Sequence, residues 1–474
     1  MLCFYNFTQA QTEIDALRYS QLTFGGTARY MAMGGAFGAL GADFSTLSTN
    51  PAGIGLYKKS EFTFSPSFYK GNTTSTFGNS EASDSKYNLN ISNVGFVFVF
   101  PLSTNAEKAG WKNVQFGFGL NRLANFNNRM YIDGFNSKSS LLTPFLDYAD
   151  GINPDDLYVF DTKLAYETDL IFDTISDGEY HYNSDMPNGG VQQTKSITTN
   201  GSINELVVSV GGNFDNKLYF GATLGFPQLR YFEQSKYTES DINDLNPYFE
   251  SFDYHQDLET KGNGYNLKAG IIYRPFDFLR LGAAVHTPTF YNWMKDNWSA
   301  SMTSRFDNAQ GYKKNSPEGE FEYTLETPMR LMGSIAFIIG DYGLISGDYE
   351  YLDYSEAKLR SDDGDFFDAN DAINNCYTDQ NNIRLGTEWR LGSMSLRGGY
   401  AWYGSPYANN INDYERRSMS FGIGFREKTY FVDFAYVRTE SNEDYYLYDK
   451  IYFTEPVKNE INNNNFIMTM GFKF

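Results

Sequence analysis

The segment FIMTMGFKF, residues 466–474, alternates between two kinds of side chain. Phe466, Met468, Met470 and Phe472 are apolar, whereas the residues between them are mostly small or polar. A period of two is that of a β-strand whose two faces meet different surroundings. Either a protein core or the lipid of a membrane must therefore cover the apolar face of this strand.

The composition of the whole chain is compatible with a membrane barrel and excludes several other classes of protein. The 474 residues include 18% aromatic and 41% hydrophobic side chains, and the formal net charge is −20. No run approaches about 18 consecutive apolar residues, so no transmembrane helix is expected. A transmembrane barrel presents only every second residue to lipid, so the lack of a long apolar run does not exclude a barrel. The negative charge argues against nucleic acid as a partner, because phosphates require patches of Lys and Arg.

About 14 segments along the chain repeat this alternation. An even number of strands is typical of single-chain bacterial barrels. The sequence therefore predicts an all-β fold, a transmembrane antiparallel β-barrel of about 14 strands. These strands are expected to begin near Glu61, Asn88, Asn113, Asn204, Lys217, Tyr265, Leu279, Met329, Gly343, Asn382, Met394, Ser418, Thr429 and Phe466.

The connections between these segments alternate in length. Short ones such as RPFDF (274–278) and GDYG (340–343) take turns with long ones, as near residues 229–262 and 439–464. Outer-membrane barrels combine short periplasmic turns with long outside loops, whereas a soluble sandwich has no reason to sort its loops in this way. The pattern predicts an integral protein of the outer membrane of a Gram-negative bacterium, in contact with outer-membrane lipid.

The chain divides into three expected parts. Residues 1–11 look like the remnant of a signal peptide, since an apolar run ends in the small residues of TQAQ. Residues 12–58 do not alternate and are rich in Gly and Ala, which favours a plug, or hatch, coiled inside the lumen. Residues 59–474 are expected to form the barrel with long extracellular loops, notably 124–201.

Residues 25–55 read GGTARYMAMGGAFGALGADFSTLSTNPAGIG, and DALRYSQ (residues 15–21) precedes them. This stretch resembles the N-terminal hatch of the FadL/TodX-type outer-membrane transporters of hydrophobic compounds, whose hatch carries an Asn-Pro-Ala motif. The motif stands here at Asn50, Pro51 and Ala52. The form with DALRYSQ is similar to members from Bacteroidetes-type bacteria. The strand count, the plug and the terminal Phe agree with that family over essentially the whole chain.

The resemblance implies passive uptake of a hydrophobic small molecule, such as a long-chain fatty acid or an aromatic compound. Outer loops would catch the ligand, which would enter between wall and plug and leave after the plug rearranges. Family members use a kink in the third strand as a lateral exit, and Gly117 and Gly119 could allow one here. The alternative function is docking, because some FadL-like barrels of Bacteroidetes-type bacteria serve a protein-secretion system and bind a protein partner.

The motif Asn50-Pro51-Ala52-Gly53 is expected to form a corner. Pro51 fixes its own φ and pushes Asn50 toward extended geometry. Gly53 and Gly55 would permit the turn into the first strand, and Asn50 can hydrogen-bond nearby backbone. The corner either anchors the plug to the wall or takes part in gating.

On several strands, charged residues alternate with the apolar residues that are expected to face lipid. Lipid exposure of an Arg or Lys near the midplane costs roughly 2 to 4 kcal/mol, so these charged residues should face the lumen. Their mixed signs favour mutual pairing and contacts with the plug. One of the cations could instead receive the anionic head group of a ligand. The candidate polar residues of the lumen are Arg280, His286, Arg330, Arg384 and Arg397.

The long segment 124–201 contains candidate amphipathic helices. Leu141, Leu142, Phe145 and Leu146 could form one apolar helical face. Such helices over the mouth of a barrel would form either an apolar landing groove for ligand or a lid that packs on neighbouring loops, and the family resemblance favours the groove.

No catalytic residue, cofactor or metal site is expected. The three histidines lie far apart in the sequence, and neither a CxxC pair nor a GxSxG motif occurs. The glycines of GAFGALGAD do not follow a strand of a βαβ unit, and no GK[ST] follows them, so a phosphate-binding loop is excluded. The sequence therefore predicts a channel or a docking protein, and no enzyme.

Overall fold

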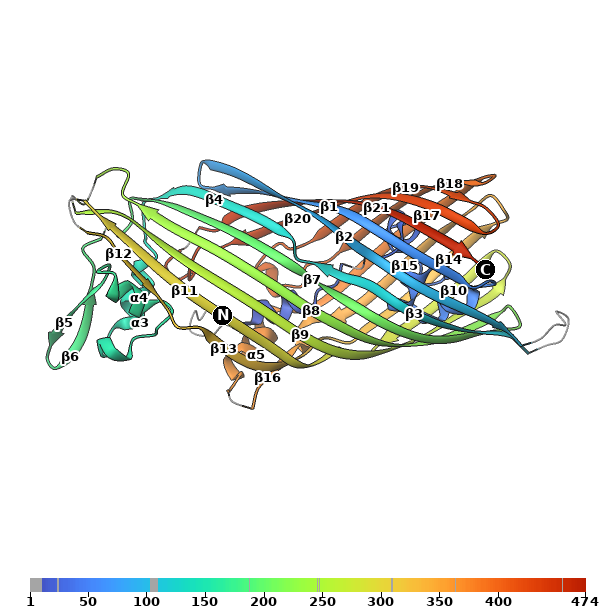
Figure 1. Ribbon diagram of the computed structural model, residues 1–474, viewed down its shortest axis with the longest axis horizontal. Coiled ribbons are helices and arrows are strands. Elements are labelled where there is room, and N and C mark those ends of the chain that lie inside the picture. The colour runs from blue at the N-terminus through green and yellow to red at the C-terminus, as the bar shows by residue number, and fades with distance from the viewer. Residues whose placement is uncertain are drawn as a thin grey trace.

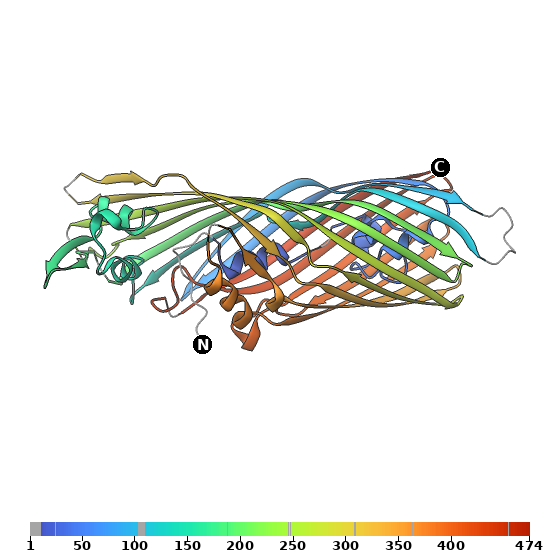
Figure 2. The same cartoon turned by 90° about the horizontal axis from the view of Figure 1, so that it is seen from below.

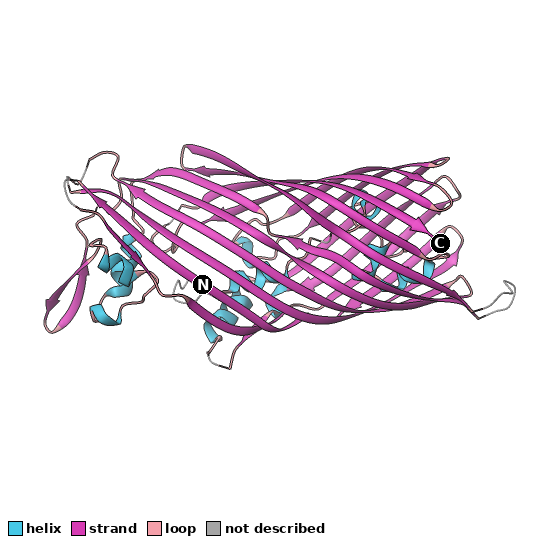
Figure 3. Ribbon diagram, in the orientation of Figure 1, coloured by secondary structure: helices cyan, strands magenta, loops and turns pink. Residues whose placement is uncertain are grey.

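The computed structural model describes residues 11–23, 25–102, 110–186, 188–244, 246, 248–307, 310–362, 364–453 and 455–474. Antiparallel strands form a long barrel (Figure 1), and helices lie inside the barrel and at one of its ends (Figure 3). No helix in the described ranges has the length and apolar character that are needed to cross a membrane.

Strands make up most of the structure. They are β1 (Glu61–Phe77), β2 (Ser80–Pro101), β3 (Trp111–Asn125), β4 (Asn128–Asn136), β5 (Phe172–Ser176), β6 (Glu179–Asn183), β7 (Val191–Phe214), β8 (Leu218–Ser240), β9 (Phe249–Phe276), β10 (Leu279–His286), β11 (Phe290–Phe306), β12 (Tyr312–Asn315), β13 (Gly319–Glu326), β14 (Arg330–Ile339), β15 (Gly343–Asp353), β16 (Lys358–Arg360), β17 (Asp379–Leu391), β18 (Met394–Tyr403), β19 (Arg416–Arg426), β20 (Tyr430–Tyr445) and β21 (Val457–Lys473). The α-helices are α1 (Glu13–Ser20), α2 (Ala28–Ala32), α3 (Leu142–Ala149), α4 (Thr162–Glu167) and α5 (Phe367–Cys376). The 3₁₀-helices are η1 (Phe44–Ser48), η2 (Pro51–Leu56), η3 (Pro154–Asp156), η4 (Tyr354–Glu356) and η5 (Ala408–Asn410).

The main sheet closes on itself. It contains 19 strands in the described residues, of which β4, β11, β14 and β16 continue the preceding strand and β12 only extends a hairpin. In the described part of the chain, 14 strands therefore circle the lumen, and β1 pairs with β21 from Glu61↔Lys473 to Thr76↔Lys458. The prediction of an all-β, 14-stranded antiparallel barrel is confirmed, and each predicted segment coincides with one strand in order.

An apolar belt surrounds the half of the barrel that carries the short turns. Met419, Phe421, Ile423 and Phe425 of β19 alternate outward and are exposed. On β21, Phe466 and Phe472 are 51% and 54% exposed, whereas the intervening Ile467 and Thr469 are buried inside. Large exposed apolar surfaces are unusual in water and typical of the lipid-facing band of a membrane barrel. The apolar face of the last strand therefore points outward, as in the lipid-facing band of a membrane barrel.

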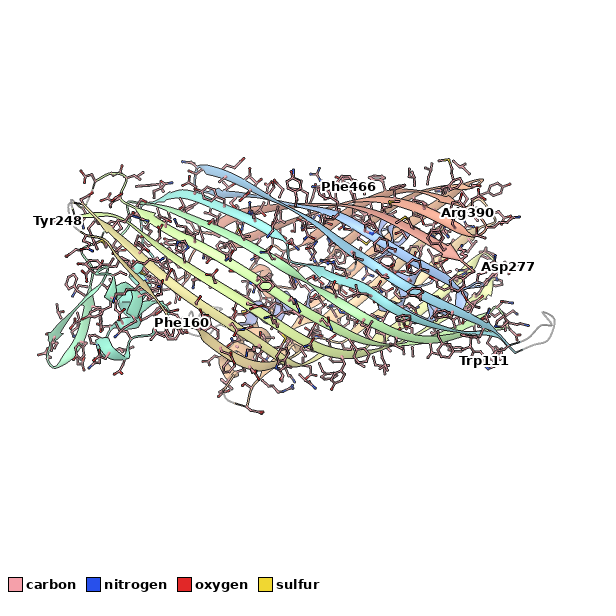
Figure 4. The ribbon with its side chains drawn as sticks, viewed as in Figure 1. Trp111, Phe160, Tyr248, Asp277, Arg390 and Phe466 are labelled. Atoms are coloured by element: carbon pink, nitrogen blue, oxygen red, sulfur yellow. The ribbon has the colours of Figure 1, made fainter. Side chains whose placement is uncertain are left out.

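One side of the barrel rises far beyond this belt. β9 is 28 residues long, and its outward residues above the exposed Tyr265 are polar, as at Lys261 and Asn263. Residues 249–264 therefore add about 50 Å of strand length at roughly 3.3 Å per residue. On the opposite side β18 is only 10 residues long. Figure 4 places Tyr248 at the tip of the tall wall, at the opposite end from Trp111, Asp277 and Arg390.

The expected long loops are largely continuous strand. Within the predicted loop 124–201, β4 pairs with the first part of β7, from Asn128↔Thr199 to Asn136↔Val191. Only residues 137–190 connect this hairpin, through α3, α4 and the β5–β6 hairpin. Similarly, β8 and β9 pair through most of 229–262. The sequence concealed these extensions because both faces of a strand outside the membrane carry Thr, Ser, Gln and Asn, so no alternation appears.

Residues 11–23 and 25–57, here called the N-terminal insert, lie inside the barrel (Figure 2). Where they are described they contain helices and turns and no strand. The backbone N–H of Thr12 donates to the Asp15 carboxylate over 3.2 Å at the start of α1. Further along, α2 contacts β18 to β21, and η2 contacts β7, β8 and β9. The expected signal-peptide remnant, residues 1–11, lies outside the described residues except for Gln11.

Candidate functional site

Buried ion pairs join the insert to the wall near the short-turn end. The Arg29 guanidinium of α2 donates to the Glu388 carboxylate of β17 over 2.8 Å. Arg397 of β18 bonds the same carboxylate over 2.8 Å and Asp433 of β20 over 2.7 Å. All four side chains are at least nine-tenths buried. Since removing one partner would leave an uncompensated charge in a dry interior, this network holds the insert strongly in place.

Other lumen residues bond the backbone of the insert directly. Arg280 donates to the Leu40 carbonyl over 2.9 Å, and Arg330 donates to the Ser20 carbonyl over 2.7 Å. His286 donates through Nε2 to the Thr49 carbonyl over 2.5 Å.

Arg384, which is also buried, donates to Glu350 over 2.6 Å. All five predicted lumen residues thus face inward, and each already has a protein partner. The arrangement matches mutual pairing and contacts with the insert rather than a free cation at these five positions.

The Asn50-Pro51-Ala52-Gly53 corner packs on glycines of the wall. The Asn50 side chain accepts from the Ala52 N–H over 3.1 Å and donates to the Gly38 carbonyl over 2.6 Å. A Cβ at Gly270 of β9 would collide with the Asn50 carboxamide, and one at Gly221 of β8 would collide with the Pro51 carbonyl. The backbone of the insert therefore approaches the sheet so closely that only glycine fits.

Gly53 and Gly55 serve a different purpose from the expected one. Neither has a positive φ, so the turn into β1 does not require them. A Cβ at Gly53 would lie 2.5 Å from Thr46 Oγ1, and one at Gly55 would lie 2.6 Å from the Gly212 carbonyl oxygen. Both are glycines because η2 packs tightly against η1 and β7.

Two adjacent cavities lie between the insert and the tall wall. The outer cavity, of about 420 Å³, is bordered by α1, α3 and the upper parts of β7, β8, β9, β11 and β20. The inner cavity, of about 350 Å³, lies deeper and is bordered by α1, β1, β3, β20 and β21. Ile14, Arg18, Tyr231 and Glu443 line both. A small molecule that enters from the long-loop end would therefore meet the outer cavity first.

Aromatic rings dominate the outer cavity. An apolar ligand would be covered by these rings, while the phenol groups remain able to hydrogen-bond. The rings are Phe145, Tyr158, Phe160, Tyr231, Tyr254, Trp298, Tyr407, Tyr445, Tyr446 and Tyr448.

The predicted loop residues divide into two groups. Leu141 and Phe145 line the outer cavity and are otherwise buried, at 5% and 2% exposure. Leu142 is buried within the apolar cluster below α3, and Leu146 packs against that cluster. Residues 141–146 therefore form part of a packed cap whose inner surface reaches the cavity, which matches the lid alternative. Their contact with a ligand stays a prediction.

Burial shifts several titrations around the outer cavity. It lowers the pKa of the Lys195 ammonium to about 8 and raises the pKa of the Glu443 carboxyl to about 7. The Asp296 carboxyl, whose pKa burial and the nearby Asp15 raise to about 7, accepts from the Gln11 side chain over 2.9 Å. The long-loop end of the lumen is thus dry enough to disfavour unpaired charge.

The pairing of the third strand is interrupted beyond Gly117 and Gly119, and a lateral exit at these two glycines stays a prediction. Pairing of β2 with β3 is continuous through Gly117 and Gly119, whose Cβ atoms would meet Leu47 and Phe44 of the insert. It stops after Asn93↔Asn121, and the β3–β7 register shifts between Arg122 and Ala124. Ser92, Arg122 and Ala124 line the inner cavity at this break. The interruption of the wall was missed because it carries no glycine.

One further cavity lies outside the lumen. A depression of about 620 Å³ on the outer surface is lined by outward apolar residues such as Phe421, Phe434 and Phe466, so it belongs to the apolar belt and not to the lumen. In the described part of the chain, no group of three or more His, Cys, Asp or Glu side chains could hold a metal ion.

Solved structures share this architecture. The P. putida toluene transporter TodX has 13% identity and a TM-score of 0.56, with 95% of this chain and 99% of that chain covered. The Ralstonia pickettii toluene transporter TbuX has 15% identity and a TM-score of 0.53, with coverage of 95% and 98%. A Pseudomonas aeruginosa FadL homologue has 11% identity and a TM-score of 0.56, with the same coverage.

At these identities the likeness concerns the fold, and for the fold the resemblance to FadL/TodX-type barrels is confirmed. No protein-family model matches the chain, and no curated protein matches its sequence.

Proposed function

We propose that this barrel, which has the fold of the TodX, TbuX and FadL-homologue structures, is an outer-membrane channel for the passive uptake of hydrophobic compounds. The observation that carries the proposal is the pair of adjacent cavities between the insert and the tall wall, which share lining residues. They begin beneath the cap formed by α3 and end at the break between β2 and β3. The candidate ligand classes are long-chain fatty acids and aromatic compounds.

In this proposal the insert acts as the plug. The salt-bridge network around Glu388 and the corner at Asn50 hold it against the wall, which closes the direct path to the short-turn end. The ligand would instead leave sideways, where the pairing of β2 and β3 stops. Arg122 donates there to the Ile91 carbonyl over 3.3 Å, and Lys86 donates to the Thr199 carbonyl over 2.8 Å. Each of these bonds bridges the break and would have to open.

Uptake into cells tests the proposal. The protein is expressed in a bacterium that lacks its own channel of this kind, and entry of labelled dodecanoate and of labelled ethylbenzene is timed. We expect faster entry of at least one compound, and loss of that gain when Ser441→Trp fills the inner cavity, which Ser441 lines. Equal entry with and without the folded protein would contradict the proposal.

Docking of a secretion-system protein is the alternative function. In the described residues no surface favours it over transport. A protein that co-purifies with the barrel while the cavities hold no small molecule would replace the transport proposal with docking.

A further inference from the structure

The depression of about 620 Å³ in the apolar belt lies on the outer surface, over the seam where the barrel closes. Its lining comes from β1, β2 and β18 to β21. Phe68, Phe421 and Phe466 project outward around it and are 42%, 62% and 51% exposed. Phe466 lies about midway between the two ends of the barrel (Figure 4). The depression can therefore hold hydrocarbon at the level where the belt ends.

Cations end the belt directly beside this depression, on the side of the long loops. The next outward residue of β1 after Phe68 is Lys70, and the next outward residue of β20 after Tyr436 is Arg438. Lys70 and Arg438 are in register with Asn464 of β21, one on each side. Since neighbouring strands lie about 4.8 Å apart, the two cations stand about 10 Å apart at the backbone.

This row of positive charge belongs to one side of the barrel. Arg417 of β19 follows Met419 outward and extends the row. On β7, β8 and β9 the outward residues at the same boundary are amides, namely Asn204, Gln228 and Asn263. The cations at the boundary of the belt thus gather around the depression, in a protein whose formal net charge is −20.

The cations of the row are free to bind an anion. Within the described residues Lys70 forms no ion pair, and its ammonium lies 5.4 Å from the centroid of the Tyr87 ring. Arg438 pairs with Glu440 over 2.6 Å, but both side chains are more than half exposed. An exposed ion pair of this kind contributes little in water. A phosphate group, which accepts charge-assisted hydrogen bonds, can therefore compete for Arg438.

The two features together identify the chemistry of the occupant. A neutral lipid would leave the cations unused, and a free phosphate would leave the depression empty. A second copy of the chain that packed through the same face would bring Lys70 and Arg438 against their own copies, and like charges would repel. A lipid with acyl chains and an anionic phosphate head group satisfies both the depression and the cations.

We propose that the depression and the cations Lys70 and Arg438 form a binding site for a phosphate-bearing anionic lipid of the membrane leaflet on the long-loop side. The acyl chains lie in the depression between Phe68 and Phe421, and the phosphate binds the two cations across Asn464. The site is separate from the lumen, so it holds whichever compound the barrel transports.

Competition between two lipids with identical acyl chains tests the proposal. The full-length protein is placed in nanodiscs of equal parts phosphatidylglycerol and phosphatidylcholine, and native mass spectrometry counts the lipids that stay bound after release. Wild type is expected to retain phosphatidylglycerol in preference to phosphatidylcholine. The double variant Lys70→Gln and Arg438→Gln is expected to lower that preference about tenfold or more, because each cation near a membrane surface attracts anionic lipid.

A pair of cations on the other side of the barrel provides the matched control. Arg230 of β8 and Lys261 of β9 are register partners on outward positions, and neither strand lines the depression. The double variant Arg230→Gln and Lys261→Gln removes the same charge and should keep the preference of wild type. Heat-modifiable migration on gels verifies that each variant is folded.

Three results would overturn the proposal. Wild type could retain both lipids equally, the Lys70 and Arg438 variant could keep its preference, or the control variant could lose the preference to the same extent. A dimer that carries no anionic lipid would assign the depression to a second copy of the chain instead. None of these results bears on uptake, which the labelled compounds measure independently.

Discussion

The two halves of the lumen are built from the same strands and differ in what those strands present inward. In the short-turn half, glycines such as Gly221 and Gly270 let the backbone of the insert touch the sheet, and ion pairs around Glu388 fix it there. In the long-loop half, the ring of Tyr231 packs edge-on against Tyr19 of α1, and the ring of Tyr254 packs against Phe145 of α3. Both tyrosines line the outer cavity.

The comparison teaches how one barrel can be both closed and receptive. Small wall residues and paired charges leave no room for water or ligand at one end. At the other end, large rings border two cavities. The inward residue at each level of a strand, rather than the fold, decides whether that level is packed shut or borders a cavity.

The largest expected effect comes from breaking the seal. Glu388→Ala would leave Arg29 without a carboxylate partner and Arg397 with only one. This change should destabilise the protein by about 3 kcal/mol, because a buried charge loses its partner. We expect a lower midpoint of thermal unfolding and a larger current through planar bilayers, since the insert loosens.

An exposed ion pair provides the control for this variant. Glu415 pairs with Arg417 over 3.0 Å on the outer surface, so Glu415→Ala should cost less than about 1 kcal/mol. Equal effects of the two substitutions, or a Glu388→Ala barrel that remains as stable and as closed as wild type, would show that the network does not hold the insert.

A smaller effect is expected from a single methyl group on the wall. Gly221→Ala would push against the Pro51 carbonyl and cost about 1 to 3 kcal/mol through overpacking. Gly333→Ala is its matched partner, because a Cβ there meets nothing within 4 Å. Urea unfolding of both variants measures the difference. Equal midpoints would mean that the insert does not rest on this part of the sheet.

The third prediction concerns pH and the long-loop half. An Asp carboxyl in an unfolded chain has a pKa near 4, whereas the folded pKa of Asp296 is raised to about 7 by burial. As the pH rises, the Asp296 carboxyl therefore loses its proton at a higher pH in the folded state than in the unfolded chain. The resulting contribution to the free energy of unfolding is complete below about pH 4 and is lost as the pH rises through about 7. Amide exchange of α1, corrected for intrinsic rates, should be about tenfold faster at pH 8 than at pH 5.

Asp296→Asn removes the titrating group and leaves a neutral partner for the Gln11 side chain. In this variant the exchange of α1 should depend less steeply on pH than in wild type. An unchanged profile would mean that Asp296 does not couple α1 to pH.

The membrane half of the fold was predictable because lipid imposes a strict pattern. On β19 and β21 every outward residue in the belt is apolar, so strand number, order and direction could be derived from the alternation. Outside the belt water meets both faces of each strand. The alternation of apolar and polar residues is absent from residues 191–203 and 249–262, so the sequence predicts loops where the structure has strands.

The candidate site was predictable in part. Lipid exposure is costly for charge, so the inward direction of Arg384 and Arg397 followed from parity. Which cations are paired depends on contacts far apart in the sequence, such as Arg29 with Glu388, and those required the structure.

Native mass spectrometry of the barrel, gently extracted from its membrane, tests the central claim most directly. If the long-loop half is a ligand chamber above a fixed insert, wild type should carry a small apolar or amphiphilic molecule in a one-to-one ratio. Ser441→Trp, which fills the inner cavity, should lose that molecule and remain folded. A wild type without any such molecule, or a Ser441→Trp barrel that retains it, would contradict the account.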